Sequence, residues 1–245
     1  MVNFYGCSFV EGGGMDNIIF YNFHNKNKKL KDDLNLYNEN ENILKKFRNE
    51  NRFSYIFEKM SNIKTENHAL SQSSNEYIFE KLYNHLKVKN NEKFIVCLTL
   101  LHRRYWYYEY TNKKYNLNGV DIHNTPYLNN ENMIPLSKTF EMYCENIFNA
   151  KDEKSKLLMQ IDLLNEFSKK NNNKIYWISW SEFDELKNTN KNYIKFENLD
   201  MNEFVIKNKL QITDETNGEF NDPHISLHGN KIIGKMIYEY IKIDR

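Results

Sequence analysis

Three short apolar runs along the chain have the length of buried β-strands. They are residues 2–5 (VNFY), 93–101 (KFIVCLTLL) and 174–180 (KIYWISW). Continuous apolar runs of this length are typical of central strands in a parallel sheet, because such strands are buried on both faces. The pattern therefore predicts strands at these three positions.

Between and after these runs the apolar residues recur at the spacing of amphipathic helices. The segments with this spacing are residues 74–87, 136–149, 152–170 and 224–243. Strands that alternate with helices predict an α/β fold with a parallel sheet covered on both faces. No internal repeat or low-complexity linker divides the chain, so we expect one domain over residues 1–245.

Two stretches interrupt this alternation. Residues 24–52 are polar and mixed in charge, with only thin apolar periodicity, which predicts a surface insertion with some helix. Residues 111–135 contain Asn, Gly and Pro and little periodicity, which predicts a loop or lid.

The charge balance and the cysteines narrow the class of protein. Lys and Arg number 34 against 33 Asp and Glu, so no global field attracts nucleic acid or an acidic membrane. No apolar run approaches the length of a membrane span. The three cysteines are far apart and form no pair with metal-ligand spacing, and no secretory signal is evident. We therefore expect a cytoplasmic protein without metal or organic cofactor. The sequence does not predict an oligomeric state.

The first apolar run is followed by a serine in a glycine-rich turn. The stretch FYGCSFVEGG covers residues 4–13 and contains Ser8. Functional groups of a parallel α/β sheet gather beyond the carboxyl ends of its strands, where backbone N–H groups can stabilise negative charge. Ser8 is therefore a candidate nucleophile. The alternative is an ordinary turn residue, because Gly and Ser are common in turns.

A serine nucleophile needs a base, and the stretch NDPHISLHGNK offers one close to the last predicted helix. Asp222 and His224 flank Pro223 there, so that the carboxylate can orient the imidazole. The alternative is that Asp222 caps the final helix and His224 lies in its first turn. His228 is expected to be a surface or packing residue.

The run HRRYWYYEY at residues 102–110 has three possible roles. Its rings can alternate into the core while an arginine caps the strand end. They can also line a cleft for a sugar or another substrate. Stacking on nucleic-acid bases is the third role, which the near-zero net charge disfavours.

Several of these blocks resemble the SGNH/GDSL hydrolase family, above all its phage-type members. The blocks that carry the resemblance are GCSF (6–9), ENHALSQSSNEYIFEKL (66–82), CLTLLHRRYWYY (97–108) and DPHISLHGNKIIGKMI (222–237). They occur in the order expected of the family, and the helix–strand unit at residues 156–180 also fits its pattern. Only the first and last blocks are specific.

The resemblance implies a flavodoxin-like three-layer fold and hydrolysis of an ester. It makes Ser8 the nucleophile, His224 the base and Asp222 the group that orients the histidine. The family holds the oxyanion with the backbone N–H of the serine, a backbone N–H of the second block and an Asn side chain.

This chain departs from the family pattern at three places. Gln72 replaces the glycine of the second block, and the third-block Asn is not recognisable, so Asn75, His102 or Arg103 would substitute for it. The acid and base residues of the last block are two apart, where most of the family spaces them three apart. One lost oxyanion donor typically costs about 10²–10³ in rate.

We expect a serine esterase that removes an acyl group, such as acetyl, from a carbohydrate or similar polar ester. The alternative, motivated by the departures at the oxyanion site, is an SGNH-fold protein that binds a glycan, nucleotide or protein partner without hydrolysis. A nucleic-acid-binding role rests only on residues 102–110.

Overall fold

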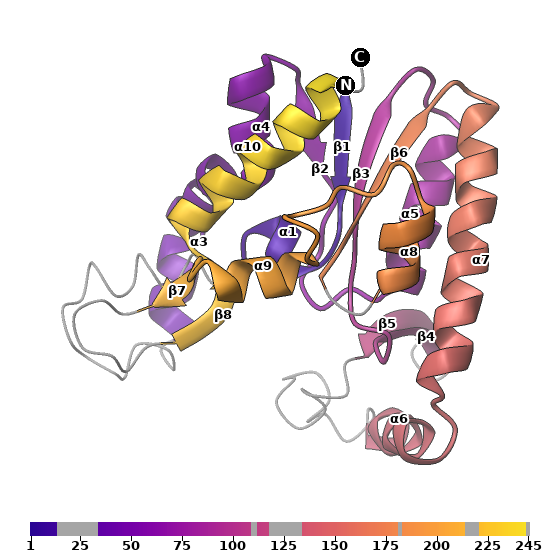
Figure 1. The fold of residues 1–245 in the computed structure, drawn as a ribbon. Helices are drawn as coiled ribbons and strands as arrows, with labels where there is room; N and C mark the ends of the chain where they lie inside the picture. Colours follow the sequence, from indigo (N-terminus) through magenta and orange to yellow (C-terminus); the bar gives the residue numbers. More distant parts are fainter. Residues whose placement is uncertain (14–33, 109–111, 118–133, 181–182, 214–220, 244–245) are drawn as a thin grey trace.

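The computed structural model describes residues 1–13, 34–108, 112–117, 134–180, 183–213 and 221–243. These residues form an α/β fold around a four-stranded, all-parallel sheet (Figure 1). Its strands, in spatial order, are β2 (Thr65–Asn67), β1 (Val2–Tyr5), β3 (Lys93–Leu98) and β6 (Lys174–Ser179). The α/β class and the three predicted strands are confirmed.

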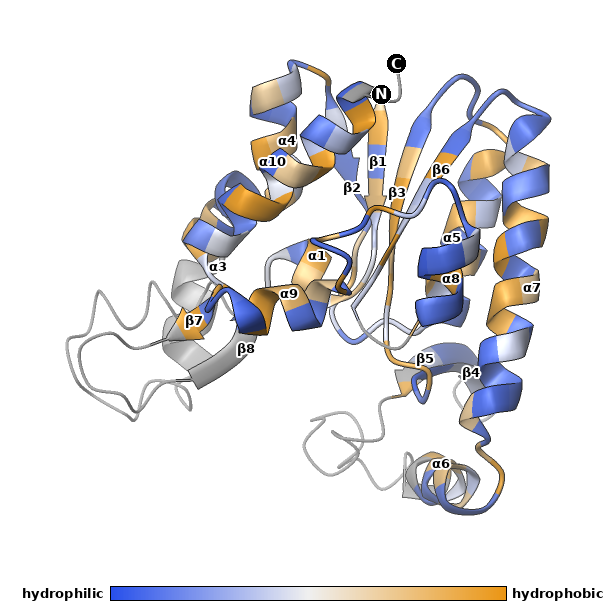
Figure 2. Ribbon diagram, viewed as in Figure 1, coloured by the Kyte–Doolittle hydropathy of each residue, from blue (hydrophilic) through white to orange (hydrophobic). Residues whose placement is uncertain are grey.

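Helices cover both faces of this sheet (Figure 1). One face is covered by α1 (Ser8–Glu11), α4 (Phe53–Ser61), α9 (Met201–Lys207) and α10 (Leu227–Ile243). The other is covered by α5 (Asn75–Leu86), α7 (Ala150–Lys169) and α8 (Asp184–Thr189). Figure 2 shows α7 and α10 alternating between hydrophobic and hydrophilic residues, as expected of helices with one face against a sheet.

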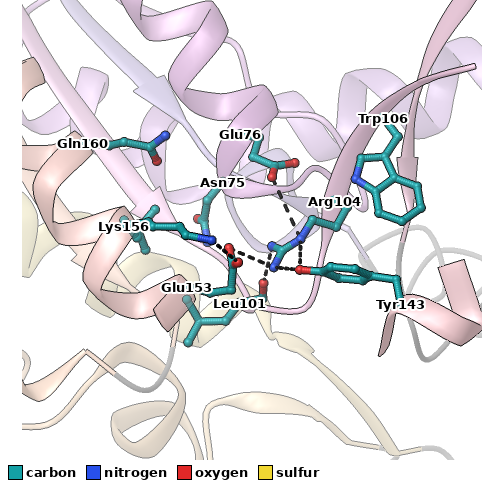
Figure 3. A pocket seen from close by; sticks show the side chains of 10 residues that line it. Asn75, Glu76, Leu101, Arg104, Trp106, Tyr143, Glu153, Lys156 and Gln160 are labelled. Atoms are coloured by element: carbon teal, nitrogen blue, oxygen red, sulfur yellow. Dashed lines mark hydrogen bonds and ion pairs between the residues drawn. The ribbon is translucent and has the colours of Figure 1, made fainter. Parts of the chain in front are cut away.

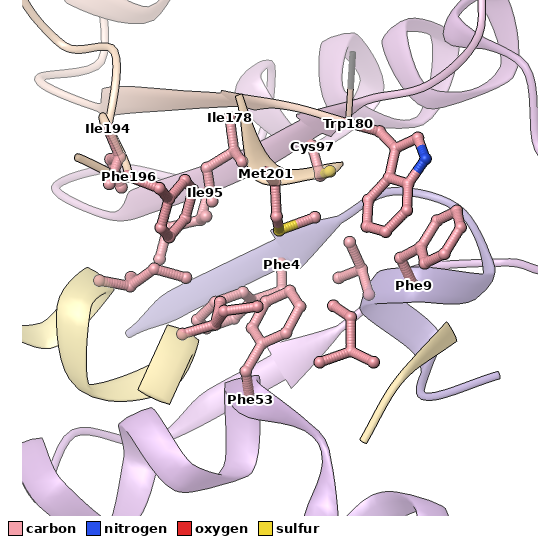
Figure 4. Close-up of a cluster of buried hydrophobic side chains, with 14 of the residues drawn as sticks. Phe4, Phe9, Phe53, Ile95, Cys97, Ile178, Trp180, Ile194, Phe196 and Met201 are labelled. Atoms are coloured by element: carbon pink, nitrogen blue, oxygen red, sulfur yellow. The ribbon is translucent and has the colours of Figure 1, made fainter. Parts of the chain in front are cut away.

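The strand residues alternate between the two layers of core. In β1, Phe4 packs with α4 and α10, and Tyr5 faces the opposite layer. Large rings supply much of this packing: Phe4 meets Phe53 and Phe57 edge-on, with ring centroids 5.9 and 5.7 Å apart. Figure 4 shows this aromatic layer between β1, β3 and the neighbouring helices. Edge-to-face pairs of this kind add about 0.5–1.5 kcal/mol each to the free energy of area burial.

The last predicted helix begins three residues later than its apolar pattern indicated. Residues 221–225 instead form β8 (Asn221–Ile225), which pairs antiparallel with β7 (Gln211–Thr213). Pro223 disfavours helical backbone at the residue before it. Ser226 then starts the helix, because its hydroxyl accepts the N–H of Gly229 at 3.1 Å.

The predicted insertion at residues 24–52 contains a helix, and the predicted loop at residues 111–135 contains a strand. Helix α3 (Leu34–Asn51) supplies the predicted helix of the insertion, while residues 24–33 lie outside the described residues. The loop prediction for residues 111–135 is wrong over β5 (Lys113–Leu117), which pairs with β4 (Arg104–Tyr108). Its lid interpretation concerns residues 118–133, which are also outside the described part. Helix α6 (Ile134–Asn146) follows.

The sequence pattern missed β5 because its apolar positions are few. Tyr115 and Leu117 pack with Trp106 and Phe140 in a small cluster separate from the main core. That cluster forms only when β4, β5 and α6 come together, so the local sequence carries little signal for it.

Helices α4 and α10 approach closely at Gly234. A Cβ at this position would lie 2.9 Å from both the Cβ of Ile56 and the carbonyl oxygen of Phe53. We therefore expect Gly234→Ala to lower the free energy of unfolding by about 1–2 kcal/mol, because overpacking against backbone outweighs the gain of about 1 kcal/mol in helix propensity. Urea unfolding measures this change in the free energy of unfolding. The exposed Lys231→Ala in the same helix is the control, and an equally small change in both variants would contradict the close contact.

Two histidines form a half-buried cluster with Tyr5 beside β2. The rings of Tyr5 and His68 stack with centroids 5.0 Å apart, and His85 meets His68 edge-on at 4.6 Å. The Tyr5 hydroxyl shares a hydrogen bond with Nδ1 of His85, and Nε2 of His68 lies 3.2 Å from Oδ1 of Asn3. Both histidines thus pack against the end of β1.

Burial lowers the pKa of both His68 and His85, and burial also raises the pKa of Tyr5. A neighbouring positive charge lowers each histidine pKa further: His85 acts on His68, and Lys89 acts on His85. Glu66 and Glu92 oppose these effects and raise the pKa of both histidines, whereas Lys81 lowers the pKa of His85.

A histidine whose pKa is lower in the folded than in the unfolded state stabilises the fold only above the unfolded value of about 6.5. We therefore expect the free energy of unfolding to fall between pH 7.5 and pH 5.5. The double variant His68→Gln/His85→Gln should show a smaller fall, and the exposed His228→Gln should match wild type. Urea unfolding at the two pH values measures this, and an equal pH dependence in all three proteins would contradict the assignment.

Candidate active site

Ser8 lies just beyond the carboxyl end of the central strand β1. Gly6 and Cys7 separate it from Tyr5, and the extended backbone of Cys7 (φ −98°, ψ −157°) makes it the N-cap residue of α1. Ser8 is the first residue of that short helix and is 8% exposed. Its hydroxyl therefore lies at the edge of the sheet where parallel α/β folds place their functional groups.

The imidazole of His224 reaches this serine from β8. Its Nε2 lies 3.0 Å from Oγ of Ser8, although the two residues are 216 positions apart in sequence. This distance is within the range of a nucleophile and its general base. His224 lies in a strand three residues before α10 begins, so the alternative that placed it in the first turn of the last helix is wrong.

The third member of the predicted triad is only partly described. The backbone of Asp222 lies in β8 and pairs with Ile212 of β7, but its side chain lies outside the described part of the structure. Its role as the residue that orients His224 stays a prediction.

Two buried aromatic side chains pack beside the Ser8–His224 pair. The ring of Phe9 lies 4.9 Å from the His224 ring and stacks on Trp180, with centroids 3.3 Å apart. Figure 4 shows Phe9 and Trp180 together at one end of the aromatic layer. The backbone N–H of Trp180 donates to Leu98 at 3.0 Å, so this wall is fixed to the end of β3. Neither Phe9 nor Trp180 was predicted as a site residue. Only their positions in the sequence could have indicated them, because Phe9 follows Ser8 and Trp180 ends a predicted strand.

The glycines after Ser8 meet two different needs. Gly12 ends α1 in the left-handed region with φ of 94°, where a side chain is strained. Gly13 has little space: a Cβ there would lie 2.8 Å from Cβ of Ser8 and 3.1 Å from Nε2 of His224. The approach of the histidine to the serine therefore depends on a missing side chain at residue 13.

The second block docks against the backbone that leads to Ser8. The carbonyl oxygen of Gly6 accepts the N–H of Leu70 at 3.1 Å and the hydroxyl of Ser73 at 2.9 Å. The N–H of Ser73 donates to Leu70 at 3.1 Å, which closes a tight turn, and Gln72 in that turn has φ of 62°. Glycine adopts this conformation most easily. Gln72 thus keeps the turn geometry in spite of its side chain.

Asn75 joins the second block to the end of β3. Its Nδ2 donates to the carbonyl oxygen of Thr99 at 3.0 Å, and its Oδ1 accepts the N–H of Thr99 at 2.8 Å. Both ends of the amide are thus engaged with one backbone unit. This arrangement fixes Thr99 and directs the amide of Asn75 toward β3.

His102 and Arg103 lie in the turn between β3 and β4. His102 is half-buried, whereas Arg103 is only 8% exposed and donates from Nη1 to Oγ1 of Thr99 at 2.9 Å. The structure thus connects Arg103 with Thr99 and Asn75 at the end of β3.

Within the aromatic run, the side chains alternate along β4. Trp106 and Tyr108 pack in the small cluster around Phe140, while Tyr107 is exposed. This alternation agrees with the packing interpretation of the run; residues 109–110 are outside the described part. A cavity of about 310 Å³ lies beside Trp106, between α5, α6 and α7 (Figure 3). Its lining includes Glu76, whose pKa burial raises.

The described residues offer no cluster of His, Cys, Asp or Glu that could hold a metal ion. In the same part of the chain, no helix combines the length and apolar character needed to cross a bilayer. Comparisons with protein-family models, curated proteins and solved structures found no significant match to this chain.

The close packing at residue 13 gives a test of the site geometry. We expect Gly13→Ala to separate the His224 ring from Ser8, because its Cβ would crowd both side chains. ¹⁵N NMR spectra of the imidazole should then show the same loss of the Nε2 hydrogen bond in Gly13→Ala as in Ser8→Ala. An unchanged His224 signal in Gly13→Ala, in a protein with wild-type circular dichroism, would contradict this geometry.

Proposed function

We propose that this protein is a serine esterase of the SGNH type. The observation that carries the proposal is the 3.0 Å contact between Oγ of Ser8 and Nε2 of His224 at the carboxyl edge of a parallel sheet. A serine hydroxyl and an imidazole within hydrogen-bond distance form the core of an activated nucleophile. The order of the blocks along the chain supports the same family.

In the proposed mechanism, Nε2 of His224 accepts the proton of Ser8 as Oγ attacks the carbonyl carbon of the ester. The ester C–O bond then breaks, and the alcohol leaves with the proton held on Nε2. Water attacks the acyl-enzyme, again losing a proton to His224, and releases the acid and the free serine. Asp222 orients the imidazole.

The backbone N–H groups of Ser8 and Gln72 serve as the donors to the oxyanion. Two observations support Gln72: its turn is hydrogen-bonded to Gly6, and its left-handed backbone is the conformation that a glycine would adopt there. Donors that are fixed before the reaction stabilise the developing charge most effectively.

The packing around Ser8 favours a small acyl group. Ser8 is nearly buried, and Gly13 leaves no room for a Cβ beside it. The ring of Phe9, which stacks on Trp180, lies 4.9 Å from the ring of His224. We therefore propose deacylation, foremost deacetylation, of a carbohydrate or similar polar ester. The competing function is binding of such a ligand without hydrolysis.

A fluorophosphonate probe followed by intact-mass measurement tests the proposal. We expect one adduct on wild type and none on Ser8→Ala, because the probe reacts with an activated serine. The labelling rate of His224→Ala should fall by about 10²–10⁴, the range of general-base contributions.

The matched control is His228→Ala, which removes an exposed histidine four residues further on and should label like wild type. Circular dichroism of every variant shows that it is folded. If folded wild type forms no adduct, the esterase proposal is wrong, and binding without hydrolysis takes its place.

A further inference from the structure

Two consecutive arginines after β3 are buried to the same extent but differ in their partners. Arg103 is 8% exposed and Arg104 is 6% exposed. Burying a guanidinium group is costly unless a negative charge and hydrogen bonds compensate for its lost hydration. The two side chains therefore make a direct comparison.

Arg104 is fully compensated (Figure 3). Its Nε and Nη2 donate to the hydroxyl of Tyr143, and its Nη1 donates to the carbonyl oxygens of Leu101 and Arg103 at 2.7 and 3.1 Å. Nη2 also lies 3.0 Å from a carboxylate oxygen of Glu153. This arginine holds β4 to α6 and α7, so it is structural.

Arg103 lacks such compensation. Its one hydrogen bond from the side chain to a described residue joins Nη1 to the neutral hydroxyl of Thr99, at 2.9 Å. Its Nε is buried and has no hydrogen-bond partner in the described part of the chain. No described carboxylate lies within ion-pair distance of it, in contrast to Arg104. A buried cation in this state is an incomplete site for an anion.

The register of the sheet places this cation at the same edge as the serine. Tyr5 of β1 pairs with Val96 of β3, and Ser8 and Thr99 each lie three residues beyond that pair. The two segments stay adjacent past the ladder, because a Cβ on Gly6 would lie 3.2 Å from Cβ of Cys97.

We propose that Arg103 binds an anionic group, a carboxylate or a phosphate, on the molecule that enters the Ser8 site. The planar guanidinium matches both groups and donates to two of their oxygens at once. The proposal that this molecule is a substrate rests on the esterase function; the anion site itself does not. The ester would then belong to an acidic molecule, such as an acylated uronic acid or sugar phosphate.

Anion binding is tested first in Ser8→Ala, where no hydrolysis interferes. The thermal midpoint is measured with sodium phosphate or sodium glucuronate at ionic strength held constant with chloride. We expect a rise of ~3–6 °C at about ten times the dissociation constant for at least one of the two anions, which also tells carboxylate from phosphate. Ser8→Ala/Arg103→Gln should show no rise.

Without added anion, Arg103→Gln should be at least as stable as its parent, because it removes an uncompensated buried charge. Arg104→Gln should be less stable, because it breaks a satisfied network. If Arg103→Gln does not fold, Arg103→Lys replaces it, and this variant should bind the anion more weakly because the ammonium lacks the planar fork.

The second measurement compares kcat/KM for a carboxylate-bearing acetyl ester and a neutral acetyl ester of similar size. Arg103→Gln should lower the ratio of the two values by about 10–100-fold, the effect of a hydrogen bond to a charged group. Equal losses on both esters would overturn the proposal and assign Arg103 to the oxyanion. A thermal midpoint that neither anion changes would also overturn the proposal. If anion binding holds but the fluorophosphonate probe does not react, the esterase function fails and the anion site stands.

Discussion

The central position of β1 is the constraint on which the rest of the site depends. It pairs with β2 on one side and β3 on the other, and all four of its residues are buried. The chain that leaves it must therefore emerge in the middle of the sheet edge, where Ser8 stands. The segments that follow the two neighbouring strands emerge on either side, so the turn of Gln72 and the Thr99–Arg103 segment flank the serine for topological reasons.

Much of the fold was predictable because its main strands and helices carry their own signals. The continuous run at residues 93–98 and the helical spacing at residues 150–169 reflect burial that each element needs wherever it packs. The hairpins β4–β5 and β7–β8 carry no such signal, since their pairing depends on distant partners. The position of His224 in a strand was missed for the same reason, because the apolar period of α10 runs on into the residues before it.

The sequence motifs predict Ser8 and His224 as a nucleophile and its base, and the structure places the two side chains together. Asn75, His102 and Arg103 are equivalent candidates for the missing oxyanion donor in the sequence, because residue type alone does not reveal what a side chain contacts. The structure separates them: both ends of the Asn75 amide hold Thr99, whereas Arg103 keeps a buried donor with no partner among the described residues. Asp222 stays a prediction from spacing and resemblance.

Ser8 and His224 lie in parts of the fold that are held in place by different interactions. Ser8 follows a strand inside the core, whereas His224 lies on a two-stranded hairpin outside the central sheet. The N–H of Ser226 donates to the carbonyl oxygen of Leu210 at 2.8 Å and closes the base of the hairpin. Leu210 and Ile225 pack into the core there, beside the close contacts of Gly229. Short hairpins open at lower free energy than core strands. A local opening of β7 and β8 would therefore separate His224 from Ser8 while the four-stranded sheet stays paired, so loss of the site and global unfolding are separable events.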